Sequence, residues 1–223
     1  MGSYLQRLQI ECLYNLCYNF KQTEIQGVLK LMDPITHAVV GLSIAVLLGE
    51  PISLSNPAII GCVAGAVIPD GDIIMQMKGD YVYLKNHRGL SHSIPAMFIY
   101  VAFITGVLWF VLGSLPIWKV LFFSLIGCFS HIALDITNSY GAQILWPLSK
   151  RRFTLDLLLI YDPMLIVMCL LILLPALRNL IPPVISILLF LAYLVLRNWM
   201  KHIAKNVVLD NLEGKYGSVY LRI

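Results

Sequence analysis

The sequence predicts an all-α fold, a polytopic integral membrane helical bundle, and two observations carry that prediction. The 223 residues are 59% hydrophobic and only 13% charged, and their mean hydropathy is +0.80, whereas soluble domains average roughly 45–50% apolar and about 25% charged residues. Long stretches also lack charge, and no Asp, Glu, Lys or Arg occurs between Arg88 and Lys119. A helix that crosses about 30 Å of hydrocarbon needs roughly 20 mostly apolar residues. The composition therefore excludes an ordinary soluble domain.

Charge-poor runs divide the chain into about six membrane segments, of which we expect the first two to be short. The runs are 34–49, 51–69, the stretch between Arg88 and Lys119, 120–134, 163–177 and 179–196. Residues 1–31 lack the compact apolar core of a signal peptide and are interpreted as an N-terminal extension or an interfacial helix. Residues 32–198 form the predicted membrane-embedded domain. Residues 199–223 are polar, and we expect a cytoplasmic tail that stops early, at the start of a strand.

The distribution of Lys and Arg predicts how the chain lies in the membrane. The net charge is +4, which could indicate a nucleic-acid partner, but the basic residues are scattered over the loops and do not gather on one soluble face. Fourteen of the sixteen fall in the termini and in alternate connections, and cytoplasmic loops carry the Lys and Arg excess. We therefore predict a multi-pass protein of the cell membrane, with both termini cytoplasmic and the lipid bilayer as its partner. We expect no nucleic acid, and the sequence gives no prediction of the oligomeric state.

Ionisable side chains beside the apolar segments are the candidates for function, because such groups are costly in a membrane and usually face the protein interior or a wet cavity. The histidines and aspartates of this kind share one predicted location, the cytoplasmic ends of the segments. They are His37, Asp70, Asp72, His87, His92, His131, Asp135, Asp156 and Asp162, with Asn138 just beyond the fourth segment. His202 lies in the basic tail and is not included. The topology and the ionisable residues therefore indicate the same membrane face.

The spacing of these residues predicts a divalent metal site. His131 and Asp135 are spaced i, i+4, which places imidazole and carboxylate on one helical face, and Asn138 continues that stripe. Four histidines with two or three aspartates exceed the ligands of a single zinc ion, and they could hold one ion or a pair about 3.5–4 Å apart. Nitrogen and oxygen ligands without thiolate favour zinc, with manganese or iron as alternatives, over magnesium or calcium.

Each candidate also has a plainly structural interpretation. Asp33 and Asp162 precede prolines, which is typical of an N-cap followed by proline at the first helical position. Asp70 and Asp72 flank a glycine, so a turn is the alternative, and a single histidine such as His37 is often only hydrogen-bonded at the membrane interface. If each residue had only its structural role, the gathering of four histidines at one end of the predicted bundle would be a coincidence. We therefore favour the metal site.

Four motifs in combination resemble the YdjM-like family of bacterial membrane-bound, metal-dependent hydrolases. They are Asp-Pro-x-Thr-His at 33–37, Pro-Asp-x-Asp at 69–72, His-Arg-Gly-x-Ser-His-Ser at 87–93 and His-x-x-x-Asp-x-x-Asn at 131–138. The resemblance covers about 32–177. More remotely, that family is similar to the zinc-dependent phospholipase C and single-strand nuclease group. The resemblance implies a hydrolase whose metal-site residues are His37, Asp70, His87, His92, His131 and Asp135, with Asp72 close by.

Our leading hypothesis is hydrolysis of a phosphoester, such as a phospholipid headgroup, by metal-activated water at the cytoplasmic membrane face. The metal would lower the pKa of water from 15.7 towards about 7, and Asp70 or Asp72 is the expected base. Arg88 presents a planar fork that could neutralise charge in the transition state, and its alternative role is to set the topology. Asn138 could orient a ligand or bind substrate.

Two other functions stay open. A metal or proton transporter could use the same ligands for translocation, although transporter sites usually lie near the bilayer midplane between repeats, and these residues cluster at one boundary. A non-catalytic membrane scaffold could keep the metal for folding alone. An intramembrane zinc protease is disfavoured, because no His-Glu-x-x-His motif occurs.

Overall fold

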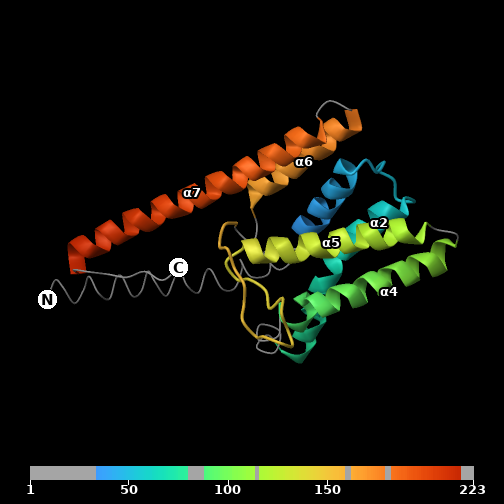
Figure 1. Ribbon diagram of the computed structural model, residues 1–223, viewed down its shortest axis with the longest axis horizontal. Coiled ribbons are helices and arrows are strands. Elements are labelled where there is room, and N and C mark those ends of the chain that lie inside the picture. Colours follow the sequence, from blue (N-terminus) through green and yellow to red (C-terminus); the bar gives the residue numbers. More distant parts are fainter. Residues whose placement is uncertain (1–33, 80–87, 114–115, 159–161, 179–181, 217–223) are drawn as a thin grey trace.

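The computed structural model describes residues 34–79, 88–113, 116–158, 162–178 and 182–216 (Figure 1). Helices dominate these ranges, in which β pairing is limited to two isolated bridges, from Asn138 to Leu158 and from Ala142 to Phe153. The predicted all-α fold is therefore confirmed. The predicted N-terminal extension, residues 1–31, and the strand expected at the end of the tail lie outside the described residues.

Each of the six predicted apolar segments contains a helix. The first runs over Pro34–Leu47, and the others are α2 (Pro57–Val67), α4 (Ile94–Leu112), α5 (Ile117–Thr137), α6 (Pro163–Arg178) and α7 (Pro183–Tyr216). Two 3₁₀ helices lie between them: η1 (Ile68–Lys78) continues α2, and η2 (Leu90–His92) directly precedes α4.

Within the described residues, four helical stretches are long and apolar enough to cross a membrane. They are Pro57–Ile74, Ile94–Leu112, Ile117–Thr137 and Val184–Val207, while Pro34–Leu47 and Pro163–Leu174 are shorter apolar helices. A helical membrane bundle is thus confirmed, but the prediction that the first two segments are the short ones is wrong for the second. The reason is η1, which continues α2 to Ile74 in a stretch that is apolar enough on average although it includes Asp70 and Asp72. The short segments are the first and the fifth.

Helix starts follow from local capping chemistry. The side chain of Asn56 accepts a hydrogen bond from the backbone N–H of Ala58 and so caps α2, with Pro57 at the first helical position. Ser93 caps α4 in the same way. Asp162 accepts from the N–H groups of Met164 and Leu165 at 3.1 and 3.3 Å. The sequence left capping and a functional role open for Asp162, and the structure shows the capping contacts, whereas Asp33 lies outside the described residues.

The centre of the bundle is the close packing of α2 on α5, with α4 beside them (Figure 1). Small residues allow this approach. A methyl group at Gly127 would overlap the carbonyl oxygen of Cys62, and one at Gly65 would overlap the carbonyl oxygen of Ser124. Small residues at membrane helix interfaces let backbones come close and pack well. This contact fixes how the end of α2 lies relative to the end of α5, where the candidate site is built.

The α6–α7 pair packs on the other side of the first helix. Leu158, Leu165, Cys169 and Tyr193 form a buried cluster there, against which Val39 of the first helix packs. Figure 1 shows α7 running back along α6 and on past its start. The polar tail predicted from residue 199 therefore begins as a continuation of this helix, and the predicted boundary at 198/199 falls inside α7.

The two ends of the bundle differ in chemistry. At the end where α5 begins, Lys119 forms a 2.8 Å ion pair with Glu50, which follows the first helix. At the other end, where α5 finishes, η1, η2 and the start of the first helix come together with their buried histidines and aspartates. The chain passes back and forth, so residues far apart in sequence share that end.

Candidate metal centre

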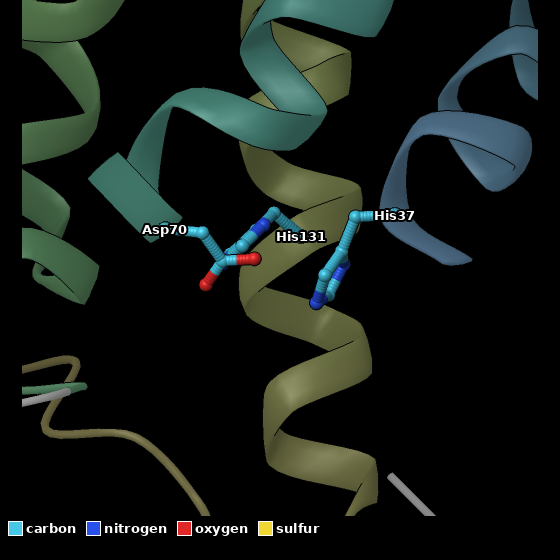
Figure 2. A group of neighbouring side chains, drawn as sticks. All are labelled: His37, Asp70 and His131. Carbon is cyan, nitrogen blue, oxygen red and sulfur yellow. The ribbon is translucent and has the colours of Figure 1, made fainter. Parts of the chain in front are cut away.

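Four elements contribute side chains to one buried cluster. His37 comes from the first turn of the first helix, Asp70 from η1, His92 from the end of η2, and His131 with Asp135 from the last two turns of α5. Figure 2 shows His37, Asp70 and His131 converging from three of these elements. His92, His131 and Asp135 are fully buried, and His37 is 2% exposed. The predicted meeting of these residues in one place is therefore observed.

Two histidines and two carboxylates of this cluster bring four donor atoms close together. The Nε2 atoms of His92 and His131 lie 2.9 Å apart. An oxygen of Asp135 lies 3.0 Å from the former and 3.5 Å from the latter. An oxygen of Asp70 lies 3.6 Å from each of the two nitrogens. The four atoms thus surround one small volume.

Hydrogen bonds on the far side of each ring determine which nitrogen faces that volume with a lone pair. Nδ1 of His131 lies 2.7 Å from the carbonyl oxygen of Ala66. A carbonyl only accepts, so Nδ1 carries the proton and Nε2 presents its lone pair. Nδ1 of His92 lies 2.8 Å from the hydroxyl of Ser91, which itself donates to Asp72 at 2.8 Å. The hydroxyl has one proton, so His92 also donates from Nδ1 and presents the Nε2 lone pair.

Two lone pairs that face each other at 2.9 Å need a positive charge between or beside them. In the metal-free protein a proton can supply it. Burial lowers the pKa of His92, but its contacts with the carboxylates of Asp135 and Asp70 outweigh that effect and raise the pKa to about 9. A divalent cation is the other species that suits this position.

Asp70 supplies a second sign that a cation belongs here. Neither of its carboxylate oxygens has a hydrogen-bond partner among the described residues, and both are shielded from solvent. Burying a carboxylate without hydrogen bonds is costly, and buried charges are normally paired or bound to metal. Among the described residues, the nearest cationic groups are the imidazoles of His92 and His131, which are neutral when they ligate a metal.

The donor set fits a tetrahedral zinc ion. Bonds of roughly 2.0–2.1 Å from zinc to nitrogen and oxygen place neighbouring ligand atoms about 3.3 Å apart. The three separations among Nε2 of His92, Nε2 of His131 and the facing oxygen of Asp135 are 2.9, 3.0 and 3.5 Å, and an oxygen of Asp70 lies beside them, 3.6 Å from each nitrogen. Borderline metals such as zinc, manganese and iron accept this mixture of imidazole and carboxylate. The residues therefore fit the group that the sequence predicts.

His37 lies next to this set. Its ring stacks on the ring of His131 with centroids 3.8 Å apart, and its Nε2 lies 3.7 Å from the second oxygen of Asp135. His37, Asp70 and His131 also offer three ligand atoms within 4.8 Å of one another. Asp135 therefore faces His92 and His131 with one oxygen and His37 with the other.

Arg88 and Asn138 contact the Asp135 oxygen that faces His37. One guanidinium nitrogen of Arg88 lies 3.1 Å from the Asp135 carboxylate, and another donates to the Asn138 side chain at 2.8 Å. Arg88 is 2% exposed and adopts a left-handed backbone conformation with φ 58°, which costs of order 1–3 kcal/mol for a residue other than glycine. This strained backbone conformation brings the Arg88 guanidinium to the Asp135 carboxylate.

The remaining sequence candidates have other locations. His87 lies outside the described residues. Asp156 is partly exposed and lies 3.5 Å from Lys201 of α7, and Asp162 is bonded to Tyr193, so neither takes part in the cluster described above. His202 is exposed on α7.

The sequence analysis assigned no role to two of the groups that orient the histidines. Ser91 is part of the quoted motif, and its place directly before a candidate ligand is the one signal that could have singled it out. The carbonyl oxygen of Ala66 leaves no trace in the sequence, since every residue has one.

Comparison with known proteins identifies a family and leaves the reaction open. The sequence model of a family described as YdjM inner membrane protein matches residues 32–204. A curated relative from Bacillus subtilis (strain 168), named uncharacterized protein YfhP, is 33% identical over 138 residues, which cover 59% of this chain and 42% of that protein. The chain thus spans less than half the length of that relative. No solved structure matches the chain.

Proposed function

The chain belongs to the YdjM inner membrane protein family, and from that premise we propose that it is an integral membrane metal-dependent hydrolase of phosphoester bonds. One observation carries the proposal. Two buried imidazoles present their Nε2 atoms to each other at 2.9 Å, flanked by the buried carboxylates of Asp70 and Asp135. This arrangement supports a cation site inside a membrane protein.

Three residues would hold the cation and a fourth would serve as base. His92, His131 and Asp135 form one three-ligand group, and catalytic zinc sites usually have three protein ligands and one open position. When bound, a divalent cation supplies Lewis acidity and lowers the pKa of a coordinated water towards about 7. Asp70, whose oxygens lack hydrogen bonds in the described chain, is suited to take the proton from the attacking water.

Arg88 and Asn138 would act through Asp135. The Arg88 guanidinium pairs with the Asp135 carboxylate at 3.1 Å, and the Asn138 amide lies 3.4 Å from the same oxygen. Both contacts fix the direction of the carboxylate. The positive charge of Arg88 would also stabilise negative charge that develops on a phosphoryl group beside the cluster.

His37 gives the proposal its second cation position. His37, Asp70 and His131 form a second group whose ligand atoms lie within 4.8 Å of one another. Asp135 offers one oxygen to each side. We therefore propose zinc as the metal, with one ion at the His92–His131–Asp135 group and room for another near His37.

The surroundings favour a lipid phosphoester as the substrate. Exposed apolar side chains border the site on the same 3₁₀ helices that carry its ligands: Ile74 and Met77 of η1 are 69% and 88% exposed, and Leu90 of η2 is 50% exposed. Such side chains suit contact with acyl chains. The ligands sit at helix ends rather than at mid-span, which favours hydrolysis at the bilayer surface over transport. From the basic residues we propose that this end is cytoplasmic.

Metal analysis combined with a hydrolysis assay tests the proposal. We expect the purified protein to bind zinc and to hydrolyse bis-p-nitrophenyl phosphate or phosphatidylglycerol in vesicles. His131→Ala and Asp135→Ala should lose metal and activity together, since each removes a ligand, whereas the exposed His202→Ala should retain both. Unchanged metal content in the ligand variants would reject the site. Bound zinc without hydrolysis would reject the enzyme and favour transport or a scaffold.

A further inference from the structure

We propose that Ser91 and Asp72 form a positioning pair that fixes the tautomer of His92 and thereby makes its Nε2 available to a metal. This inference rests on the proposed metal centre, and it gives Asp72 a role other than that of a base. It concerns two side chains that need not touch the cation.

The three residues form a continuous chain of hydrogen bonds. The Ser91 hydroxyl donates to an oxygen of Asp72 at 2.8 Å, and the same hydroxyl lies 2.8 Å from Nδ1 of His92. The backbone N–H of Arg88 also donates to that oxygen of Asp72 at 3.3 Å. Among the described residues, this oxygen of Asp72 thus accepts from two donors, and the Asp72 side chain is only 3% exposed.

The direction of each bond follows from the groups involved. An ionised carboxylate only accepts, so the single hydroxyl proton of Ser91 points to Asp72. The Ser91 oxygen is then left with lone pairs only, and it accepts from Nδ1–H of His92. The Nε2 atom of His92 consequently faces His131 and Asp135 with its lone pair. If the hydroxyl proton pointed the other way, Nε2 would carry the proton and could not bind a metal.

The two metal-facing histidines thus obtain the same tautomer by different means. His131 donates its Nδ1–H to the backbone carbonyl of Ala66, an acceptor that substitution cannot remove. His92 depends on a side chain, and 3₁₀ helix η2 places Ser91 next to it. Partners of this kind typically change metal affinity 10- to 100-fold when they are removed. Because the tautomer of His92 depends on the Ser91 hydroxyl, a substitution at Ser91 can test it.

The experiment measures zinc affinity by competition with a chelator in full-length Ser91→Ala, Ser91→Thr and Ser93→Ala. We expect Ser91→Ala to weaken zinc binding by roughly 10- to 100-fold and Ser91→Thr, which keeps the hydroxyl, to stay within about threefold. Ser93 is the matched control, because its hydroxyl caps α4 and lies outside the chain of hydrogen bonds to His92. Ser93→Ala should lower the melting temperature and leave zinc affinity unchanged.

Nitrogen-15 NMR of labelled histidine in Asp72→Asn separates positioning from simple loss of stability. An Asn amide can donate to Ser91, which reverses the chain and moves the His92 proton to Nε2. In the metal-free protein, at a pH high enough for the His92 ring to be neutral, we therefore expect a changed tautomer signal, together with weaker zinc binding. Wild-type zinc affinity in Ser91→Ala, or an unchanged tautomer in Asp72→Asn, would overturn the inference while leaving the proposed function intact. Zinc binding that follows these expectations without any hydrolysis would reject only the proposed function, and a wild-type protein that binds no zinc would overturn both.

Discussion

Two buried aspartates at the ends of apolar helices, Asp70 and Asp162, have opposite surroundings. Asp162 accepts hydrogen bonds from two backbone N–H groups and, at 2.7 Å to each oxygen, from the hydroxyl of Tyr193, and Arg197 lies 3.8 Å away. Asp70 has no hydrogen bond to either oxygen in the described chain, and its nearest charged partners are histidine nitrogens at 3.6 Å.

The contrast shows that a carboxylate beside a membrane segment does not by itself indicate a functional site. Asp162 is fully satisfied by its own neighbourhood, so its role is to cap α6 and to tie α6 to α7. Asp70 is buried in a place where only a proton or a cation would balance its charge and the lone pairs beside it. The sign of function here is a buried polar group without hydrogen bonds, placed where side chains from several helices meet. It can be recognised only when the spatial neighbours of the carboxylate are known.

The largest expected effect is a difference in zinc affinity between the variants Asp70→Asn and Asp162→Asn. Asp70→Asn should weaken zinc binding by roughly 10- to 100-fold, because it removes a negative charge beside the cation. Asp162→Asn should leave zinc affinity within about threefold and instead lower stability by about 1–2 kcal/mol, since it weakens a cap and a charged hydrogen bond. Chelator competition and thermal unfolding check both variants. Equal effects of the two substitutions on zinc affinity would remove the distinction.

A smaller effect concerns pH. The pKa of His92 is raised to about 9 in the metal-free protein, so zinc must displace one proton, and its apparent affinity should rise about tenfold per pH unit between roughly 6.5 and 9. The raised pKa also stabilises the metal-free fold. This contribution is fully present below pH about 6.5 and is lost as the pH rises through about 9. Titrations with zinc and unfolding of the metal-free protein at several pH values measure the two trends, and a zinc affinity independent of pH would contradict them.

The smallest expected effect concerns the satisfied aspartate. Tyr193→Phe removes the hydroxyl that donates to Asp162, and a hydrogen bond to a charged group is worth about 1.5–3 kcal/mol. We expect a loss of about 1–2 kcal/mol, because the two backbone donors to Asp162 remain. Zinc affinity should not change. A change in zinc affinity would show that the α6–α7 pair and the metal centre are coupled.

Much of the fold could be predicted because it depends on local properties of the chain. Apolar runs located the helices, and proline after Asp162 correctly indicated a cap. Segment lengths were harder, because η1 extends α2 through residues that include two aspartates, Asp70 and Asp72, which the charge count treated as the end of a segment. The continuation of α7 through the polar tail was missed for a similar reason: charged residues favour water, but a helix can carry them beyond the membrane.

The candidate site was predictable in its members and less so in its connections. Spacing of i, i+4 paired His131 with Asp135, and the costs of burial indicated Asp70 and His92. The connections join residues from different elements. One is the chain of hydrogen bonds from Asp72 through Ser91 to His92, and the other is the contact of Arg88 and Asn138 with Asp135. No periodicity within one segment encodes such contacts.

Hydrophobicity and helical period act over a few neighbouring residues, so the order of residues was enough to predict a helical membrane protein with histidines and aspartates at the ends of its apolar segments. Packing between distant segments settles which of those residues share one buried volume, which carboxylate lacks hydrogen bonds among the described residues, and which ring nitrogen faces its neighbours. Those outcomes depend on the close approach of α2 and α5 at Gly65 and Gly127, since that packing sets the distances between side chains far apart in the chain.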